Sequence, residues 1–325
     1  MQPLFRVAAG PRIGFGHLMR CRSLARALGV APRVSIRGSV ATVAAAAAQG
    51  FTPVPGGLSV LAQGGAPGVL IVDDPMATAA ARWVRRAREQ RIPVATLHDL
   101  GLGYVDSDLA IDGSIDQGDH RGEVALGGPL YAVLDPSVSQ ARALPPVERD
   151  GVLIALGGGE HVHHWGTTLA RAILARRPQT PVRIVRGFAK PAATVDLPGV
   201  RWVSAPGGLA DELRRPAVAV VAGGVTLYEA AALGTPTVAI AVAPAQQLTI
   251  RGFARRGAVV DAGIVTDPAA FAHAADAVAD LMTHPGRAAR LGGTAAHLVD
   301  GRGVFRVADA ITQLARRAED HFHAA

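Results

Sequence analysis

Cysteine, lysine and aromatic residues are scarce in this sequence of 325 residues. Cys21 is the single cysteine, so no disulfide can form within the chain, which is typical of a reducing compartment. Aromatic residues make up only 4% of the chain, too few for a surface that stacks single-stranded nucleic acid or long glycans. Lysine occurs once, at Lys190, and the arginines are dispersed without a recognisable nucleic-acid motif. We therefore expect no nucleic-acid partner.

Long apolar runs are also missing. No run approaches the roughly 20 residues that span a bilayer, and the first residues lack the charged start and apolar core of a signal peptide. We therefore expect a cytoplasmic protein without stable membrane insertion. The chain is 49% hydrophobic and 18% charged, which suffices for two domains with buried cores. Its net charge of +7 favours an anionic ligand such as a phosphate ester, although a general bias toward arginine would give the same composition.

Short apolar runs alternate with helix-like segments throughout, which is the βαβ pattern of parallel sheets covered by helices. The expected strands are 4–9, 34–37, 69–72, 94–97, 109–111, 152–156, 182–185, 218–221 and 238–241. The expected helices are 17–28, 44–48, 78–90 and one that starts near Trp165, and the end of the chain is expected to be wholly helical.

The pattern breaks at Leu144-Pro145-Pro146, because adjacent prolines disfavour helix and strand alike. A strand, a glycine loop and a helix then follow again from Val152. The sequence therefore predicts an α/β protein of two Rossmann-like domains, 1–145 and 150–325, facing across a cleft. The C-terminal helix is free to pack back on the first domain. Ligands of parallel sheets bind outside the carboxyl ends of the strands, so the cleft is the expected site.

The first candidate site is the glycine loop that ends in Gly14-Phe15-Gly16-His17, with Arg20 one turn later. The glycines permit a tight turn and close approach to a ligand, and a helix start suits anions. The same helix start disfavours an imidazolium, so we expect His17 to be neutral and able to accept a proton. We expect Gly14, Gly16 and Arg20 to bind the substrate. The alternative is a structural loop with a satisfied histidine.

The second candidate site, Gly223-Gly224-Val225-Thr226 with Glu229, also follows a strand and opens a helix. Its backbone amides would hold a diphosphate, Thr226 would cap the helix or donate to a phosphate, and Glu229 would accept both hydroxyls of a ribose. The alternative is an ordinary capping box, since Thr226-x-x-Glu229 has that spacing.

Three histidines near a glutamate form the third candidate, Gly158-Gly159-Glu160-His161 with His163 and His164. The spacing matches no standard zinc ligand set, so we expect no metal, and Gly158 and His161 to line the cleft instead.

Three polar residues complete the candidate set. Asp73 and Asp99 follow strands on the expected cleft side, where a carboxylate can orient a sugar hydroxyl or a histidine, or simply cap a helix. Gln246 follows the strand 238–241 and would contact a sugar or phosphate, unless it belongs to a solvated helix start.

The segment Gly14-Phe15-Gly16-His17-Leu18-Met19-Arg20-Cys21 resembles the opening of the UDP-2,4-diacetamido-2,4,6-trideoxy-β-L-altropyranose hydrolases, which act in pseudaminic acid biosynthesis for flagellin and surface polysaccharides. The spore-coat polysaccharide protein G group shares this motif. The segment 222–236 and Gln246 extend the resemblance, and the Gly-Gly…Glu pattern is similar to that of many glycosyltransferases of the two-Rossmann GT-B fold.

The resemblance implies that water attacks the anomeric carbon of a UDP-sugar and releases UDP and the free sugar, with no metal or other cofactor. It assigns the family's histidine to His17 and its ribose-binding glutamate to Glu229. The chain departs from the family at three places: His98-Asp99 replaces Asp-Asp, Glu160-His161 replaces Ser-Asp, and Ala245-Gln246 replaces Asn-Gln. Three functions therefore stay open: a hydrolase, a GT-B glycosyltransferase that uses a UDP-sugar, and a non-catalytic binding homologue.

Overall fold

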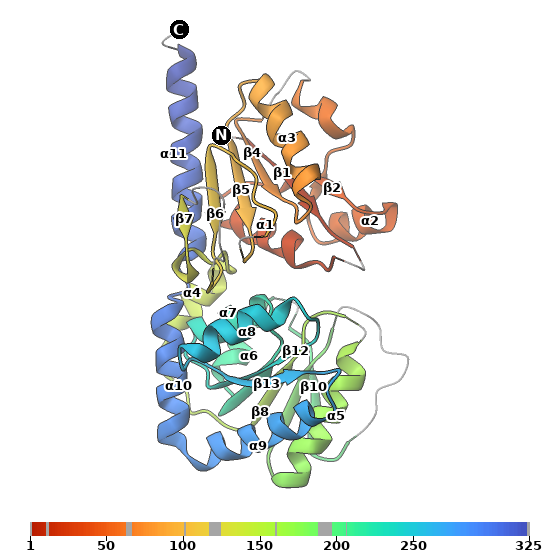
Figure 1. The fold of residues 1–325 in the computed structure, drawn as a ribbon, viewed down its shortest axis with the longest axis vertical. Helices are drawn as coiled ribbons and strands as arrows, with labels where there is room; N and C mark the ends of the chain where they lie inside the picture. Colours follow the sequence, from red (N-terminus) through yellow and green to blue (C-terminus); the bar gives the residue numbers. More distant parts are fainter. Residues whose placement is uncertain are drawn as a thin grey trace. The chain divides into compact units, whose positions relative to one another are not determined.

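A computed structural model of the protein describes residues 2–10, 13–62, 67–100, 102–116, 125–159, 161–187, 197–205 and 207–323. The chain forms two compact units, one of Met1–Pro136 with Arg302–Ala325 and one of Ser137–Gly301 (Figure 1). Each unit is an α/β structure built on its own parallel sheet.

The first unit contains a seven-stranded parallel sheet of order β3-β2-β1-β4-β5-β6-β7. Its strands are β1 (Pro3–Ala8), β2 (Arg33–Arg37), β3 (Thr52–Pro53), β4 (Val69–Asp73), β5 (Val94–His98), β6 (Leu109–Asp112) and β7 (Leu126–Gly127). Its helices are α1 (Gly16–Ala27), α2 (Val40–Ala48), α3 (Ala77–Glu89) and α11 (Gly303–His323), with short 3-10 turns at Gly57–Leu61 and Pro129–Tyr131.

Alternate residues of the strands in this sheet pack into two different cores, as the two-residue period of a strand requires. Phe5, Ile71 and Leu97 face a core shared with α1 and α11. Leu70 and Val72 face the opposite core, which contains Trp83 of α3. This alternation decides which strand-end residues can meet the start of α1.

The second unit contains a six-stranded parallel sheet of order β10-β9-β8-β11-β12-β13. Its strands are β8 (Val152–Ala155), β9 (Val182–Val185), β10 (Val200–Val203), β11 (Val218–Val221), β12 (Thr237–Ala241) and β13 (Val260–Ile264). Its helices are α5 (His161–Arg176), α6 (Ala210–Arg214), α7 (Val225–Ala232), α8 (Gln246–Arg255), α9 (Ala269–Thr283) and α10 (Pro285–Leu298). Helix α4 (Pro136–Ala143) crosses the boundary between the units.

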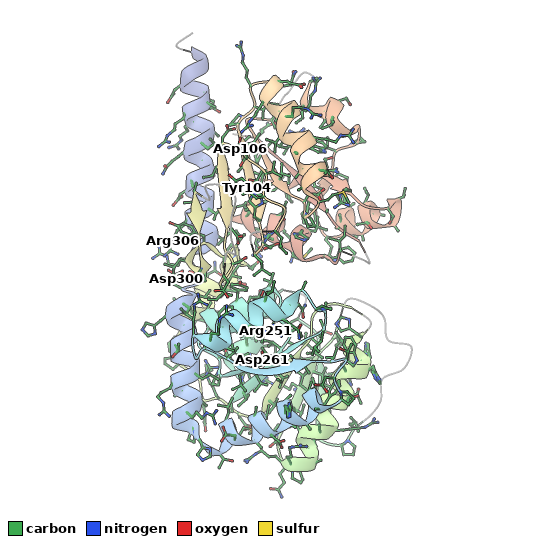
Figure 2. All side chains as sticks on the ribbon, in the orientation of Figure 1. Tyr104, Asp106, Arg251, Asp261, Asp300 and Arg306 are labelled. Atoms are coloured by element: carbon green, nitrogen blue, oxygen red, sulfur yellow. The ribbon has the colours of Figure 1, made fainter. Side chains whose placement is uncertain are left out.

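The helix α11 belongs to the first unit, although it follows the whole of the second in sequence. Its residues Val304, Val307 and Ile311 are fully buried in the core beneath α1. Arg306, which is labelled in Figure 2, donates a hydrogen bond of 2.8 Å to the carbonyl of Leu130. The units therefore differ from the expected ranges 1–145 and 150–325, because the apolar stripe of α11 completes the first core.

All nine expected strands are present within one or two residues of their predicted ends, and the C-terminal part is helical as expected. The four remaining strands are not predicted from the sequence, and all of them lie at the edges of the two sheets: β3, β7, β10 and β13. Helix α5 begins at His161 rather than near Trp165, so the histidines lie within a helix. No helix in the described part of the chain is long and apolar enough to cross a membrane.

Candidate functional site: a histidine and aspartate cluster on the first unit

Two carboxylates reach the same face of the first sheet from neighbouring strands. Asp73 is the last residue of β4, and it continues the alternation of Val69 and Ile71 toward the α1 face. Asp99 follows β5 directly and continues the alternation of Ala95 and Leu97. Because β4 and β5 are parallel neighbours, their carboxyl ends lie side by side. Asp73 is completely buried, whereas the Asp99 side chain is 49% exposed.

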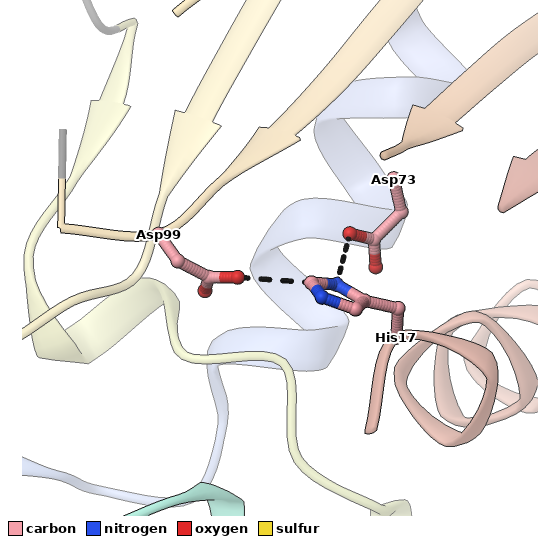
Figure 3. A group of neighbouring side chains, drawn as sticks. All are labelled: His17, Asp73 and Asp99. Carbon is pink, nitrogen blue, oxygen red and sulfur yellow. Dashed lines mark hydrogen bonds and ion pairs between the residues drawn. The ribbon is translucent and has the colours of Figure 1, made fainter. Parts of the chain in front are cut away.

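His17 meets these carboxylates from the first turn of α1. Backbone hydrogen bonds pair Gly10 with Gly14, whose φ of +86° only glycine adopts readily, and the helix begins two residues later at Gly16. The Nδ1 atom of His17 lies 2.8 Å from Oδ1 of Asp73 and 3.9 Å from Oδ2 of Asp99 (Figure 3). Since an ionised carboxylate can only accept, Nδ1 carries the proton and Nε2 is left as the basic nitrogen.

Arg20, one turn later in α1, donates to all four carboxylate oxygens of the cluster. Its Nε and Nη2 atoms donate to Asp73 at 2.8 and 2.6 Å, and Nη1 and Nη2 donate to Asp99 at 2.6 and 3.0 Å. This is a double bidentate contact, in which the planar guanidinium fixes both carboxylates. Arg20 is expected from the sequence to bind substrate, but four of its five guanidinium N–H groups donate to Asp73 and Asp99.

The charges of the cluster shift its pKa values in opposite directions. Burial alone would raise the pKa of the Asp73 carboxyl, but Arg20 and His17 outweigh burial and hold it far below its ordinary value. Burial alone would lower the pKa of His17, but Asp73 outweighs burial and raises it. The helix start is expected to disfavour the imidazolium, but the pKa of His17 shifts upward, because the buried carboxylate favours the charged form. Burial also raises the pKa of the neighbouring Cys21 thiol well above its usual value, so this cysteine is not a nucleophile.

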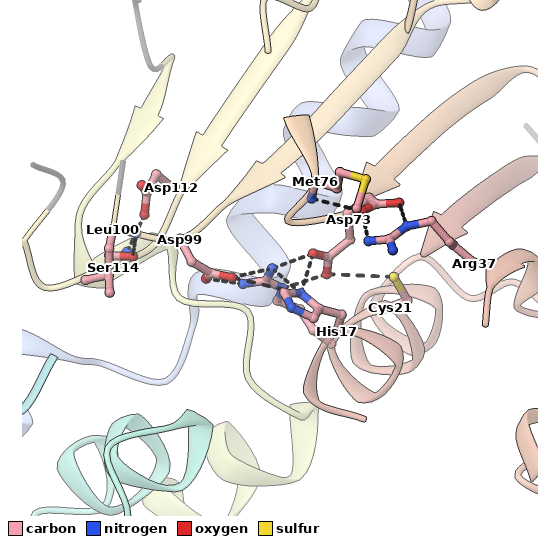
Figure 4. A network of polar contacts seen from close by, with 11 residues as sticks. His17, Cys21, Arg37, Asp73, Met76, Asp99, Leu100, Asp112 and Ser114 are labelled. Carbon is pink, nitrogen blue, oxygen red and sulfur yellow. Dashed lines mark hydrogen bonds and ion pairs between the residues drawn. The ribbon is translucent and has the colours of Figure 1, made fainter. Parts of the chain in front are cut away.

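Asp74, the next residue, has different partners. Its carboxylate accepts two hydrogen bonds from Arg37, at 2.8 and 2.6 Å, and a third from the backbone N–H of Met76 at the start of α3 (Figure 4). Arg37 in turn lines a pocket of about 460 Å³ together with the first turn of α2. Asp73 therefore orients a histidine, whereas Asp74 binds Arg37 and the backbone N–H that precedes α3.

His98, a position at which the chain departs from the family it resembles, does not take part in this cluster. It points to the opposite face of β5, where Nε2 lies 2.8 Å from the hydroxyl of Thr96 and the ring stacks on Tyr104 at 5.2 Å. The departure at His98 is therefore a matter of packing and leaves the contacts of Asp99 intact.

One group of potential metal ligands occurs among the described residues, namely His17, Asp73 and Asp99, with ligand atoms within 4.8 Å of one another. Arg20 already engages every carboxylate oxygen of this group, and Nδ1 of His17 is hydrogen-bonded to Asp73. The donor set is therefore occupied by an internal cation, and it does not fit a metal ion without displacement of Arg20.

The second unit presents the uncapped start of α7 at the carboxyl end of β11. The N-cap residue is Gly224, and no side chain caps the helix. Thr226 thus lies inside the helix, and the capping-box interpretation of Thr226 and Glu229 is wrong. Gly223 must lack a side chain, because a Cβ there would lie 2.8 Å from the backbone of Gln246. The free amides of this helix start remain suited to a diphosphate.

Gln246 lies at the start of α8 and faces the same helix start. Its Oε1 accepts a hydrogen bond of 2.9 Å from the N–H of Val242, at the end of β12. Its Nε2 would be 3.9 Å from a Cβ at Gly224, so the amide group points toward the start of α7. The side chain is therefore held in place and is not simply solvated.

The glycine loop after β8 is closely packed, since a Cβ at Gly187 would lie 3.0 Å from the carbonyl oxygen of Gly158. His161 donates a hydrogen bond of 3.0 Å from Nε2 to the carbonyl of Leu156, while the ring of His163 stacks on Trp202 at 4.8 Å. These histidines do not converge on a common point among the described residues, and Glu160 lies outside them.

No protein-family model matches the sequence. The chain is 28% identical over 201 residues to the spore coat polysaccharide biosynthesis protein SpsG of Bacillus subtilis, a match that covers 55% of this chain and 56% of that protein. The alignment thus spans little more than half of the curated relative.

Solved structures match over nearly the whole chain. MurG of Acinetobacter baumannii has a TM-score of 0.64 at 13% identity, and covers 96% of this chain and 100% of its own. The spinosyn rhamnosyltransferase SpnG complexed with thymidine diphosphate has a TM-score of 0.64 at 16% identity, over 97% and 100%. A putative UDP-N-acetylglucosamine 2-epimerase from Listeria monocytogenes has a TM-score of 0.61 at 11% identity, over 100% and 98%. The prediction of two Rossmann-like units is confirmed, and the chain has the GT-B fold.

Proposed function

We propose that this protein is a UDP-sugar hydrolase that releases UDP and a free diacetamido-trideoxy sugar by attack of water at the anomeric carbon. The observation that carries the proposal is the His17–Asp73 pair. His17 donates from Nδ1 to a buried, ionised carboxylate, which leaves Nε2 with no protein partner among the described residues. This is the arrangement of a general base with its orienting group.

The chemistry requires little else from the first unit. Cleavage of a glycosidic bond passes through an oxocarbenium-like state, so water suffices as the nucleophile when it is positioned and deprotonated. The raised pKa of His17 makes its neutral form a stronger base at a pH above that value. His17 would take the proton from water, and Asp73 would stabilise the resulting imidazolium.

The second unit would bind the nucleotide. The uncapped start of α7 offers free amides to the diphosphate, and Glu229, in the first two turns, would accept the ribose hydroxyls. Gly158 and His161 would border this nucleotide site, and Gln246, held toward Gly224, would donate to a phosphate or to the sugar. Stabilisation of the UDP leaving group by helix amides would make a metal ion unnecessary. The resemblance to the hydrolases and the nucleotide-bound state of SpnG support a nucleotide-sugar as the ligand class.

The decisive experiment incubates the purified protein alone with UDP-2,4-diacetamido-2,4,6-trideoxy-β-L-altropyranose in water enriched in heavy oxygen. We expect free UDP and free sugar, with the label in the sugar. Label in the phosphate would mean cleavage of the P–O bond and would overturn the mechanism. His17→Ala should lower kcat by roughly 10²–10⁴-fold with little change in UDP affinity. His284→Ala, which removes an exposed histidine of the second unit, is the matched control.

A glycosyltransferase is the second candidate, because two large apolar side chains are exposed beside the cluster. Met76 is 49% and Leu102 62% exposed, and the backbone of Gly103 packs against Pro75, which brings these two segments together. An apolar acceptor could contact them, with His17 deprotonating its hydroxyl instead of water. Sugar transfer to an added acceptor, with no release of free sugar in its absence, would favour this candidate. UDP binding without turnover in either assay would indicate a non-catalytic homologue.

A further inference from the structure

The cluster around His17 contains one more carboxylate than a catalytic pair needs, and a guanidinium that substrate cannot readily reach. Arg20 is largely buried, and its donors are divided between Asp73 and Asp99, two carboxylates from different strands. With a neutral His17 the group carries two negative charges and one positive charge. Such a group costs less when each charge is held by charge-assisted hydrogen bonds, as it is here.

We propose that Arg20 and Asp99 are positioning residues that lock Asp73, and through it hold the His17 ring in one orientation and one tautomer. This inference rests on the proposed role of His17 as the base. Arg20 then has a different role from the substrate contact that its place in the motif suggests. Its double contact with Asp73 and Asp99, named the Arg20 bracket below, keeps the buried carboxylate aligned with Nδ1 of His17.

The two oxygens of Asp73 accept from Nε and Nη2 of Arg20, so the plane of the carboxylate is fixed, and Oδ1 is thereby directed at Nδ1 of His17. Asp99 in turn fixes the other edge of the guanidinium through Nη1 and Nη2. A lysine ammonium is a point charge that cannot make this double bidentate contact, so Arg20→Lys keeps the charge and loses the bracket.

The charged groups that interact with His17 come from three elements: Asp73 from β4, Arg20 from α1 and Asp99 from the turn after β5. Their charges act on the imidazole in different directions, since both carboxylates favour the imidazolium and Arg20 opposes it. Removal of Asp99 and removal of Arg20 should therefore shift the titration of His17 in opposite directions. These shifts report the charges of the two residues, whereas the tautomer of His17 reports whether they position the ring.

The test is an NMR titration of the His17 ring in the full chain without substrate, combined with the pH profile of kcat. The His17 signals are identified by their loss in His17→Asn. The variants are Asp99→Asn, Arg20→Gln and Arg20→Lys. Arg26→Gln is the matched control, because Arg26 lies on the same helix, pairs with Asp135 and is 53% exposed. Thermal unfolding confirms that each variant is folded.

We expect Asp99→Asn to lower the pKa of His17 and Arg20→Gln to raise it, with no change in Arg26→Gln. Arg20→Lys should leave the pKa close to that of the wild type. Its ¹⁵N shifts should report a mixture of tautomers in place of Nδ1–H alone, and kcat should fall by up to about 100-fold. If Arg20→Gln does not fold, Asp99→Asn and Arg20→Lys still decide the matter.

Wild-type tautomer and turnover in Arg20→Lys would overturn the proposal, as would an unchanged pKa of His17 in Asp99→Asn. The titration needs no activity, so the two proposals can fail separately. If the protein shows the expected titration shifts but releases no sugar, the positioning role of Arg20 and Asp99 holds and the proposed hydrolase activity is refuted.

Discussion

At the scale of single residues, the consecutive aspartates Asp73 and Asp74 show how strongly the direction of a side chain determines its chemistry. Both are buried, both are bound by an arginine, and they differ by one position in sequence. Asp73 points toward α1 and orients a histidine, whereas Asp74 accepts hydrogen bonds from Arg37 and from the backbone N–H of Met76. Among the described residues Asp73 has a histidine as a partner, and this pair couples the stability of the first unit to pH near neutrality.

The shifts at Asp73 and His17 predict how the stability of the first unit depends on pH. The folded pKa of His17 is raised, so its contribution is fully present below the unfolded value of about 6.5 and is lost as the pH rises through the folded value. The folded pKa of Asp73 is lowered, so its contribution is present above about 3.9 and is lost as the pH falls. We expect greatest stability from this cluster between roughly these two values.

Urea unfolding followed by circular dichroism at a series of pH values checks this expectation. His17→Asn should flatten the loss of stability on the alkaline side, while the loss on the acid side remains. His297→Asn, an exposed histidine of the second unit, should leave both sides unchanged. An alkaline dependence that survives in His17→Asn would assign it to another group.

Much of this cluster could be predicted from sequence. His17, Arg20, Asp73 and Asp99 were all candidates, because glycine loops and strand ends mark the carboxyl edge of a parallel sheet. The role of Arg20 could not be predicted, since its partners come from positions 53 and 79 residues away and depend on the twist of the sheet. The orientation of His98 could have been predicted, because it shares the strand face of Thr96 and not that of Leu97.

At the scale of elements, the start of α7 shows that one sequence pattern, Thr-x-x-Glu, is compatible with a capping box and with a ligand site. Thr-x-x-Glu has the spacing of a capping box, but Gly224 takes the N-cap position and the helix begins one residue before Thr226. Spacing alone cannot fix the residue at which a helix begins. A glycine in extended conformation can serve as N-cap, and here Gly224 takes that position two residues before Thr226. Thr226 therefore does not cap α7, and the start of this helix is left to bind a ligand.

The consequences for Thr226 and Glu229 differ. Thr226→Ala removes no cap, so the free energy of unfolding of the second unit should change by no more than about 0.5 kcal/mol. Glu229→Ala should weaken UDP binding by roughly 1.5–3 kcal/mol, the range for hydrogen bonds to a charged group. Calorimetric titration with UDP and thermal unfolding of both variants measure the two effects. A folded Glu229→Ala protein with unchanged UDP affinity would remove Glu229 from the nucleotide site.

At the scale of the whole molecule, the chain leaves its first unit and returns to it with α11. The amphipathic pattern of this helix, with buried Val304, Val307 and Ile311 along one face, shows in sequence that it must pack on something. The pattern does not say on which sheet, since both units offer apolar faces of similar composition. For this reason the sequence assigns the helix to the range 150–325 and also leaves it free to pack on the first domain, and the structure shows the second arrangement.

We expect α11 to determine the stability of the first unit. Ile311→Ala, which empties a fully buried site, should destabilise this unit by about 2–5 kcal/mol. Gln313→Ala, at an exposed position of the same helix, should change it by no more than about 0.5 kcal/mol. Hydrogen exchange resolved by segment should show faster exchange in β1 and β4 of Ile311→Ala, with β8 and β11 unaffected. Equal effects in both units would mean that they unfold as one.

The return of α11 also has a consequence during synthesis on the ribosome. A chain is made from its N-terminus, and domains generally fold as they emerge. The second unit is complete once Gly301 has been made, whereas the sheet of the first unit must wait for the final helix to cover Phe5, Val7 and Ile71. Until α11 has been made, the unit translated first of the two keeps an open apolar surface, to which chaperones and proteases can bind and through which the chain can aggregate.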